Sequence, residues 1–139
     1  MCTTPSHPPS SAALRPLAFI YDRDATRAHR LLDMRVDGCR NYAKRRDWDI
    51  AGTWLDRGTI ALSCDVRPGF SSLLDHMGKA SPTRKVLCLI HNWDRYANDR
   101  SSRTIFQQRI ALAGGYTATT FDETDLSDVV ALVGRQQSR

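Results

Sequence analysis

The chain has 139 residues, of which 41% are hydrophobic and 25% are charged, and this balance excludes an intrinsically disordered protein. Its length fits a single domain with one core of ordinary size. The formal net charge of +5, carried mostly by arginine, favours a polyanionic partner, because the planar guanidinium group suits phosphate oxygens. No apolar run approaches the length that a bilayer requires, so we expect a cytoplasmic protein.

The sequence predicts three parts. Residues 1–16 are rich in Pro, Ser and Thr and lack the basic start and apolar stretch of a signal peptide, so we expect a flexible N-terminal arm. Residues 17–125 carry the periodic patterns of one folded domain. Residues 126–139 predict a short C-terminal helix and a basic tail.

Strand-like and helix-like segments alternate along the domain. The apolar run over 17–21 predicts a buried strand. Residues 26–46 predict a helix, because apolar residues recur there every three or four positions. That apolar stripe consists of Ala28, Leu32, Val36, Cys39 and Ala43. The remaining segments are a strand over 48–56, a loop over 57–69, a helix over 69–80, a strand over 84–90, a polar turn over 91–102 leading into a helix that ends at Gly114, and a strand over 116–121.

This alternation predicts an α/β fold with a mostly parallel central sheet of about four strands and helices on both faces. Ligands of such sheets bind beyond the carboxyl ends of the strands. The polar turns that follow the first three strands should therefore converge on one edge of the sheet.

Each of these turns carries an arginine, namely Arg23, Arg67 or Arg95. Three guanidinium groups around one pocket would hold a phosphodiester and stabilise negative charge on it. In the alternative interpretation, each is a surface arginine paired with a neighbouring aspartate. The candidate aspartates are Asp22, Asp65 and Asp94. Asp94 either orients Arg95 or caps the following helix, and we favour capping.

We expect no metal and no cofactor. Cys88 and His91 have a gap of two residues between them, but no second pair of ligands accompanies them. Cys39 and Cys88 lie in apolar patterns and should be reduced core residues.

Four segments resemble the catalytic domain of the serine recombinases, the resolvase and invertase family. Residues 21–26 read YDRDAT and resemble the opening Y-x-R-V-S-T. Residues 67–77 read RPGFSSLLDHM and match R-P-G-[LF]-x-x-L-L. Residues 89–99 read LIHNWDRYAND and lie where W-x-L-D-R-L-S-R-N is expected. Residues 39–58 resemble the family's helix and second strand, and the four segments occur in the family's order over residues 17–125.

The family cuts DNA by attack of a serine hydroxyl on the scissile phosphate, and its arginines activate that serine and stabilise the transition state. The resemblance assigns such phosphate-binding roles to Arg23, Arg67 and Arg95, with Asp94 beside them. The nucleophile position, however, holds Ala25, and Asn98 replaces the second arginine of the D-R-L-S-R segment. Further departures from the family pattern are Ala97, Ile60, Ala61, His29 and Arg35.

Alanine has no nucleophilic atom, so the covalent route fails at its first step. Thr26 is the only neighbouring hydroxyl, but one residue further along a tight turn its side chain should point elsewhere. We therefore expect a protein that does not cleave DNA strands, and no residue is assigned as catalytic.

The favoured interpretation is a degenerate recombinase domain that retains contact with DNA or acts as a regulatory partner. Its expected partners are DNA, bound weakly and without sequence specificity, or an intact recombinase, and a homodimer is a further option. Two alternatives remain open. One is a protein–protein interaction module on the same scaffold, and the other is a residual phosphoryl-transfer enzyme that uses Thr26 or a positioned water.

Overall fold

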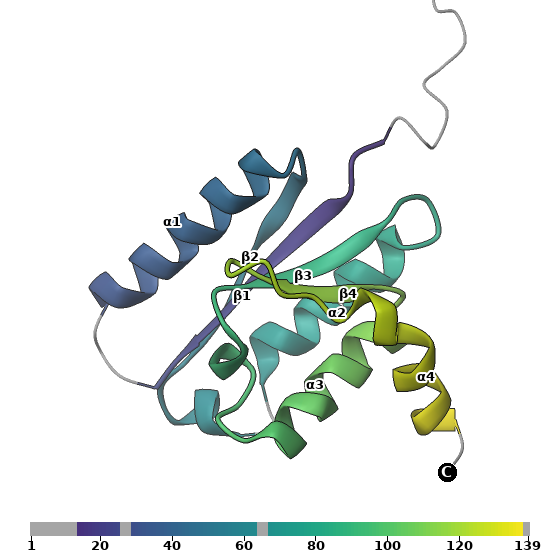
Figure 1. Cartoon of the computed structure of the whole chain (residues 1–139). Helices are drawn as coiled ribbons and strands as arrows, with labels where there is room; N and C mark the ends of the chain where they lie inside the picture. The colour runs from purple at the N-terminus through teal and green to yellow at the C-terminus, as the bar shows by residue number, and fades with distance from the viewer. Residues whose placement is uncertain (1–13, 26–28, 64–66, 138–139) are drawn as a thin grey trace, which may run out of the picture.

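The computed structural model describes residues 14–25, 29–63 and 67–137, within which four strands form one parallel sheet (Figure 1). The strands are β1 (Leu17–Asp24), β2 (Asp49–Arg57), β3 (Val86–Ile90) and β4 (Tyr116–Thr119). Their spatial order is β2-β1-β3-β4, and every neighbouring pair is parallel. The predicted α/β fold is confirmed.

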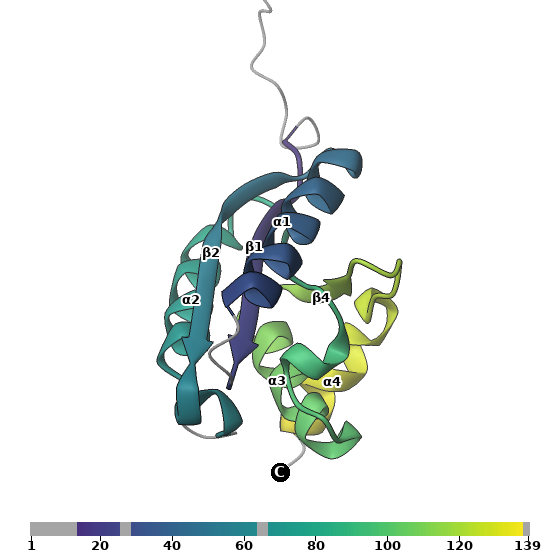
Figure 2. The ribbon, with the colours of Figure 1, turned by 90° about the vertical axis from the view of Figure 1, so that its left-hand side faces the viewer.

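The helices are α1 (His29–Arg45), α2 (Pro68–Ala80), α3 (Arg100–Leu112) and α4 (Val129–Gln137). The chain steps from β1 to β2 in one direction, then back past β1 to β3 and on to β4. Because such crossovers are right-handed, this reversal places α1 on one face of the sheet and α2 and α3 on the other. Figure 2 shows α1 and α2 on opposite sides of β1 and β2. None of the described helices is long and apolar enough to cross a membrane.

Alternating residues of β1 supply the two cores, as the pleat of a strand requires. Ala18 and Ile20 pack with α1, whereas Phe19 and Tyr21 pack with α2 and α3. The predicted stripe of α1 is buried at Leu32, Val36, Cys39 and Ala43, while Ala28 lies outside the described residues. Cys39 and Cys88 are buried free thiols.

The structure moves two predicted boundaries. β1 continues beyond Tyr21 to Asp24, because Asp22, Arg23 and Asp24 pair with the last residues of β2. The polar residues that the sequence placed in a turn are therefore part of a buried strand. β4 ends at Thr119, and the chain then folds back so that Thr124 bridges to Ala118.

The prediction that Asp94 caps the next helix is wrong. Asp94 lies inside a short 3₁₀ helix, η3 (Trp93–Arg95), which ends before α3 begins at Arg100. The cap of α3 is Asp99, whose carboxylate accepts the Ser102 amide at 2.9 Å, and this bond lowers the pKa of Asp99. Asp94 instead accepts a hydrogen bond from Arg103 at 2.5 Å.

The start of α2 lies directly against β2. Pro68 occupies the first turn of the helix, where no backbone donor is needed. A Cβ atom on Gly69 would lie 2.4 Å from the carbonyl oxygen of Leu55, so only glycine allows this approach. The Gly69 amide donates to Asp56 at the end of β2, at 2.7 Å. The Pro-Gly pair therefore sets the position of Arg67, the residue before it.

We expect Gly69→Ala to lower the free energy of unfolding by about 2 kcal/mol, because the added methyl group forces α2 away from β2. Gly78→Ala in the same helix is the control, since nothing lies within 4 Å of its Cβ position. That variant should be neutral or slightly more stable. Urea denaturation measures both, and equal stability of the two variants would contradict the close packing.

Candidate functional site

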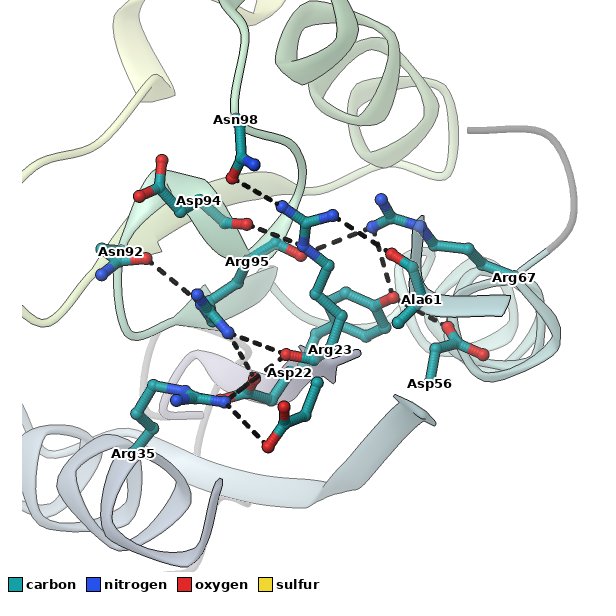
Figure 3. Close-up of polar contacts among 12 residues, drawn as sticks. Asp22, Arg23, Arg35, Asp56, Ala61, Arg67, Asn92, Asp94, Arg95 and Asn98 are labelled. Atoms are coloured by element: carbon teal, nitrogen blue, oxygen red, sulfur yellow. Dashed lines mark hydrogen bonds and ion pairs between the residues drawn. The ribbon is translucent and has the colours of Figure 1, made fainter. Parts of the chain in front are cut away.

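The structure brings the three predicted arginines together at the carboxyl edge of the sheet (Figure 3). Arg23 comes from the end of β1, Arg67 precedes α2, and Arg95 belongs to η3. Arg23 Nε donates to the Asp94 carbonyl at 2.8 Å, and Arg67 Nη1 donates to the Arg95 carbonyl at 3.4 Å. The cluster lies where the strand order reverses, between β1 and β3, which is the usual ligand position in such sheets.

Arg23 is only 8% exposed and meets neutral acceptors. Besides the Asp94 carbonyl, Nη1 donates to the Ala61 carbonyl at 3.1 Å and Nη2 to Asn98 Oδ1 at 2.9 Å. Within the described residues, no carboxylate lies within ion-pairing distance of its guanidinium. Burial lowers the pKa of Arg23, and the charges of Arg67 and Arg95 lower it further.

Arg67 is 2% exposed and is held in a similar way. Its Nε donates to the Ser63 carbonyl at 2.6 Å, and Nη1 also points to the Tyr21 hydroxyl at 3.5 Å. The guanidinium carbon lies 4.2 Å from the centre of the Phe106 ring. Its Nη2 is buried and meets no acceptor in the described part of the chain. A buried donor without an acceptor is costly.

Arg95 differs from the other two because its charge is compensated. Asp22, which is 1% exposed, accepts from Arg95 Nη1 at 3.3 Å and from Arg35 Nε and Nη2 at 2.8 and 3.0 Å. Arg95 Nη1 also donates to the Arg23 carbonyl at 2.7 Å. Asp22 and Arg23 are adjacent in a strand and therefore point to opposite faces. One arginine–aspartate network thus forms on the α1 face, while Arg23 remains without a carboxylate.

Asp56 connects β1, β2 and α2. Its carboxylate accepts the Tyr21 hydroxyl at 2.8 Å and the amides of Gly69 and Phe70 at 2.7 and 2.9 Å. A carboxylate at a helix N-terminus is favoured by the helix dipole. Burial, and next the hydrogen bond to Asp56, raise the pKa of Tyr21, which therefore stays a neutral donor. Asp56 thereby holds the segment that presents Arg67.

The sequence patterns did not assign Tyr21, Arg35 or Asp56 to the site. Asp56 had a detectable signal, because a lone aspartate ends the second strand just where an Arg-Pro-Gly helix start must dock. Arg35 had a weaker signal, because it is a basic residue beside the apolar stripe of the predicted helix. Tyr21 was counted as the last residue of an apolar run and as the first residue of the YDRDAT segment, without a role in the site.

Among the described residues, the interpretation of the arginines as residues paired with aspartates fits Arg95, through Asp22. Asp94 pairs with Arg103 instead. Ala25 is exposed in a bend directly after β1, and its methyl group offers no donor, acceptor or nucleophile. Thr26 and Asp65 lie outside the described residues. Asn98, in the place of an expected arginine, supplies a neutral oxygen to Arg23.

Within the described part of the chain, position 25 offers no side-chain group that could attack a phosphate. Arg23 and Arg67 are two neighbouring buried cations with neutral partners, an arrangement that a phosphate oxygen would stabilise. No cluster of three or more His, Cys, Asp or Glu residues in the described ranges could hold a metal ion.

Comparison with known proteins identifies the fold. No protein-family model and no curated protein sequence matches the chain. Several solved structures do. The N-terminal catalytic domain of TP901-1 integrase superimposes with a TM-score of 0.65 at 14% identity, over 87% of this chain and 94% of that chain. A resolvase family site-specific recombinase from Streptococcus pneumoniae gives 0.64 at 15% identity, over 89% of each chain.

A third similar structure is the C-terminal catalytic domain of ISC1926 TnpA, an IS607-like serine recombinase. Its TM-score is 0.62 at 19% identity, over 88% of this chain and 79% of that chain. The chain therefore has the fold of serine recombinase catalytic domains, and the resemblance that the sequence motifs indicated is confirmed at the level of the fold.

We expect Asp22→Asn to lower the free energy of unfolding by about 2 kcal/mol, because Arg35 and Arg95 lose their shared charged partner. Asp33→Asn, at an exposed position of α1, removes the same charge and should change stability by less than about 0.5 kcal/mol. Thermal or urea denaturation distinguishes the two. An equally small effect at Asp22 would show that the network contributes little.

Proposed function

We propose that this chain is a degenerate serine recombinase catalytic domain that contacts the DNA backbone without cleaving it. The observation that carries the proposal is the pair of buried guanidinium groups, Arg23 and Arg67, whose acceptors among the described residues are all neutral. The recombinase fold supports DNA as the source of the anion, since the similar structures are catalytic domains of recombinases.

Burying a cation without a carboxylate costs free energy, and a phosphodiester oxygen that approaches Arg67 Nη2 would offset part of that cost. The formal charge of +5 on the whole chain adds long-range attraction. Contacts to phosphates carry no sequence information, so we expect weak, salt-sensitive binding that is indifferent to sequence.

The absence of strand cleavage follows from two positions. Ala25 supplies no nucleophile. Asn98 stands where a second arginine would stabilise the transition state, and its amide oxygen instead accepts a hydrogen bond from Arg23. A regulatory role through pairing with an intact recombinase, or with a second copy of this chain, is compatible with this proposal. An interaction module with no role for the arginines is the alternative that the next experiment addresses.

The first experiment measures binding to a labelled DNA duplex across a salt series. Arg23→Gln with Arg67→Gln should weaken binding about tenfold or more and reduce the salt slope by about 1 to 2, since each lost phosphate contact removes about 0.9. Arg95 is kept, because it holds Asp22.

The matched control is Arg30→Gln with Arg40→Gln, two exposed arginines of α1 that remove the same charge. Circular dichroism shows whether each variant is folded. Equal binding by both double variants, or no binding by the unaltered protein, would contradict the proposal and leave the interaction module as the better interpretation.

We expect Ala25→Ser alone to form no covalent link to DNA, because the new hydroxyl would still lack a second arginine at position 98. The measurement is a shift of denatured protein bound to labelled DNA on an SDS gel. Ala25→Ser combined with Asn98→Arg is the companion variant. A covalent product from Ala25→Ser by itself would mean that only the hydroxyl is missing.

A further inference from the structure

We propose that the amino edge of the sheet carries a second surface for the backbone of duplex DNA, separate from the arginine site. This amino-edge cluster consists of Lys44, Arg45, Arg46 and Lys85. The first three end α1 or follow it directly, and Lys85 precedes β3. Figure 1 shows the end of α1 and the start of β3 at the opposite end of the sheet from the turn that follows β3.

The four cations of the cluster are exposed, and none forms an ion pair within the described residues. Nearby basic residues behave differently. Arg15 and Arg84 both pair with Asp49, at 3.7 and 2.8 Å. The charge of the amino edge is therefore only partly compensated by the chain itself, and the uncompensated part is concentrated in the cluster.

Aromatic rings connect the cluster into one surface. The Arg45 and Arg46 guanidinium carbons lie 5.5 and 5.9 Å from the centre of the Tyr42 ring. Arg46 also lies 5.3 Å from the Trp48 ring, and Lys85 Nζ lies 5.9 Å from the Tyr116 ring. These three rings and Arg46 line one pocket. Stacking on a ring orients a guanidinium and leaves its in-plane donors available.

The helix dipole explains only part of this arrangement. Lys44 and Arg45 lie in the last turn of α1, where a cation is favoured by the dipole. Arg46 lies beyond the last residue of α1, and Lys85 comes from another segment, so the dipole accounts for neither.

Acidic residues near the cluster do not neutralise it by contact. They are Asp47, Asp122 and Glu123. Asp122 accepts the Tyr42 hydroxyl at 2.7 Å, and Glu123 accepts the Thr119 hydroxyl at 2.9 Å. The balance of charge around the cluster therefore remains positive, which is complementary to a phosphodiester backbone.

Duplex DNA fits this surface better than a single strand does. Single-strand binders stack bases on accessible aromatic rings, whereas Tyr42, Trp48 and Tyr116 are all buried. The four cations of the cluster are exposed, whereas the rings beneath them offer little surface on which a base could stack. The eight residues of β1 span about 25 Å between the amino edge and the carboxyl edge of the sheet. The amino-edge cluster and the arginine site are therefore far enough apart to bind separate duplexes. The domain would then bridge two DNA segments.

The test uses Arg46→Gln with Lys85→Gln, the two positions that the helix dipole does not explain. Arg30→Gln with Arg40→Gln is again the charge-matched control. One readout is the salt slope of duplex binding, which should fall by about 1 to 2 in the amino-edge variant. The other is capture of a labelled duplex by a biotinylated duplex on beads, which should be lost in that variant and kept in the control. An amino-edge variant that matches the control in both readouts overturns the inference.

The Arg23→Gln, Arg67→Gln variant, measured alongside, separates this inference from the proposed function. If it binds DNA normally while the amino-edge variant loses binding, the proposed site fails and the amino-edge surface stands. The reverse result overturns the amino-edge surface and supports the proposed site. If both variants lose bridging and each binds a single duplex more weakly, the result supports the proposed site and the amino-edge surface together. Absence of DNA binding by the unaltered protein overturns both.

Discussion

The carboxylate of Asp56 determines how the parts of this domain meet. Asp56 is the penultimate residue of β2, and its carboxylate accepts hydrogen bonds from the hydroxyl of Tyr21 in β1 and from the Gly69 and Phe70 amides of α2. A charged acceptor at a helix N-terminus gives both orientation and stability, since the amides it satisfies have no partner within the helix. Gly69 allows α2 to approach closely enough for these bonds to form. The position of Arg67, and with it the geometry of the whole arginine cluster, depends on this contact.

The cluster separates its charges into two groups. Arg35 and Arg95 share Asp22 on the α1 side, whereas Arg23 and Arg67 face carbonyl, amide and hydroxyl oxygens on the other side. Burying two cations that meet no carboxylate among the described residues costs free energy. Such local conflicts are typical of functional sites. The phosphate contact proposed above would account for the burial of Arg23 and Arg67.

The fold does not depend on the residue at the nucleophile position. Ala25 lies after the last paired residue of β1 and is exposed, so a change there leaves the sheet and both cores intact. Asn98 likewise maintains a hydrogen bond to Arg23 and so preserves the local structure. The fold of serine recombinase catalytic domains is therefore compatible with alanine at position 25. The amino-edge cluster lies at the other end of the strands, so the DNA contact proposed for it does not depend on any catalytic residue.

The sequence by itself determined the α/β class, the number of strands, and the three arginines that meet at one edge, because hydrophobic periodicity and chain order both act locally. It placed Asp22 and Arg23 in a turn, because polar side chains at the end of a strand do not show the apolar pattern by which a buried strand is recognised. It assigned the cap of α3 to Asp94 rather than Asp99, because η3 leaves no trace in the hydrophobic pattern. The partners of each arginine were decided only by the tertiary structure. Whether a guanidinium meets Asp22, a carbonyl or nothing depends on segments far apart in the chain, and those distances arise only when the sheet is assembled.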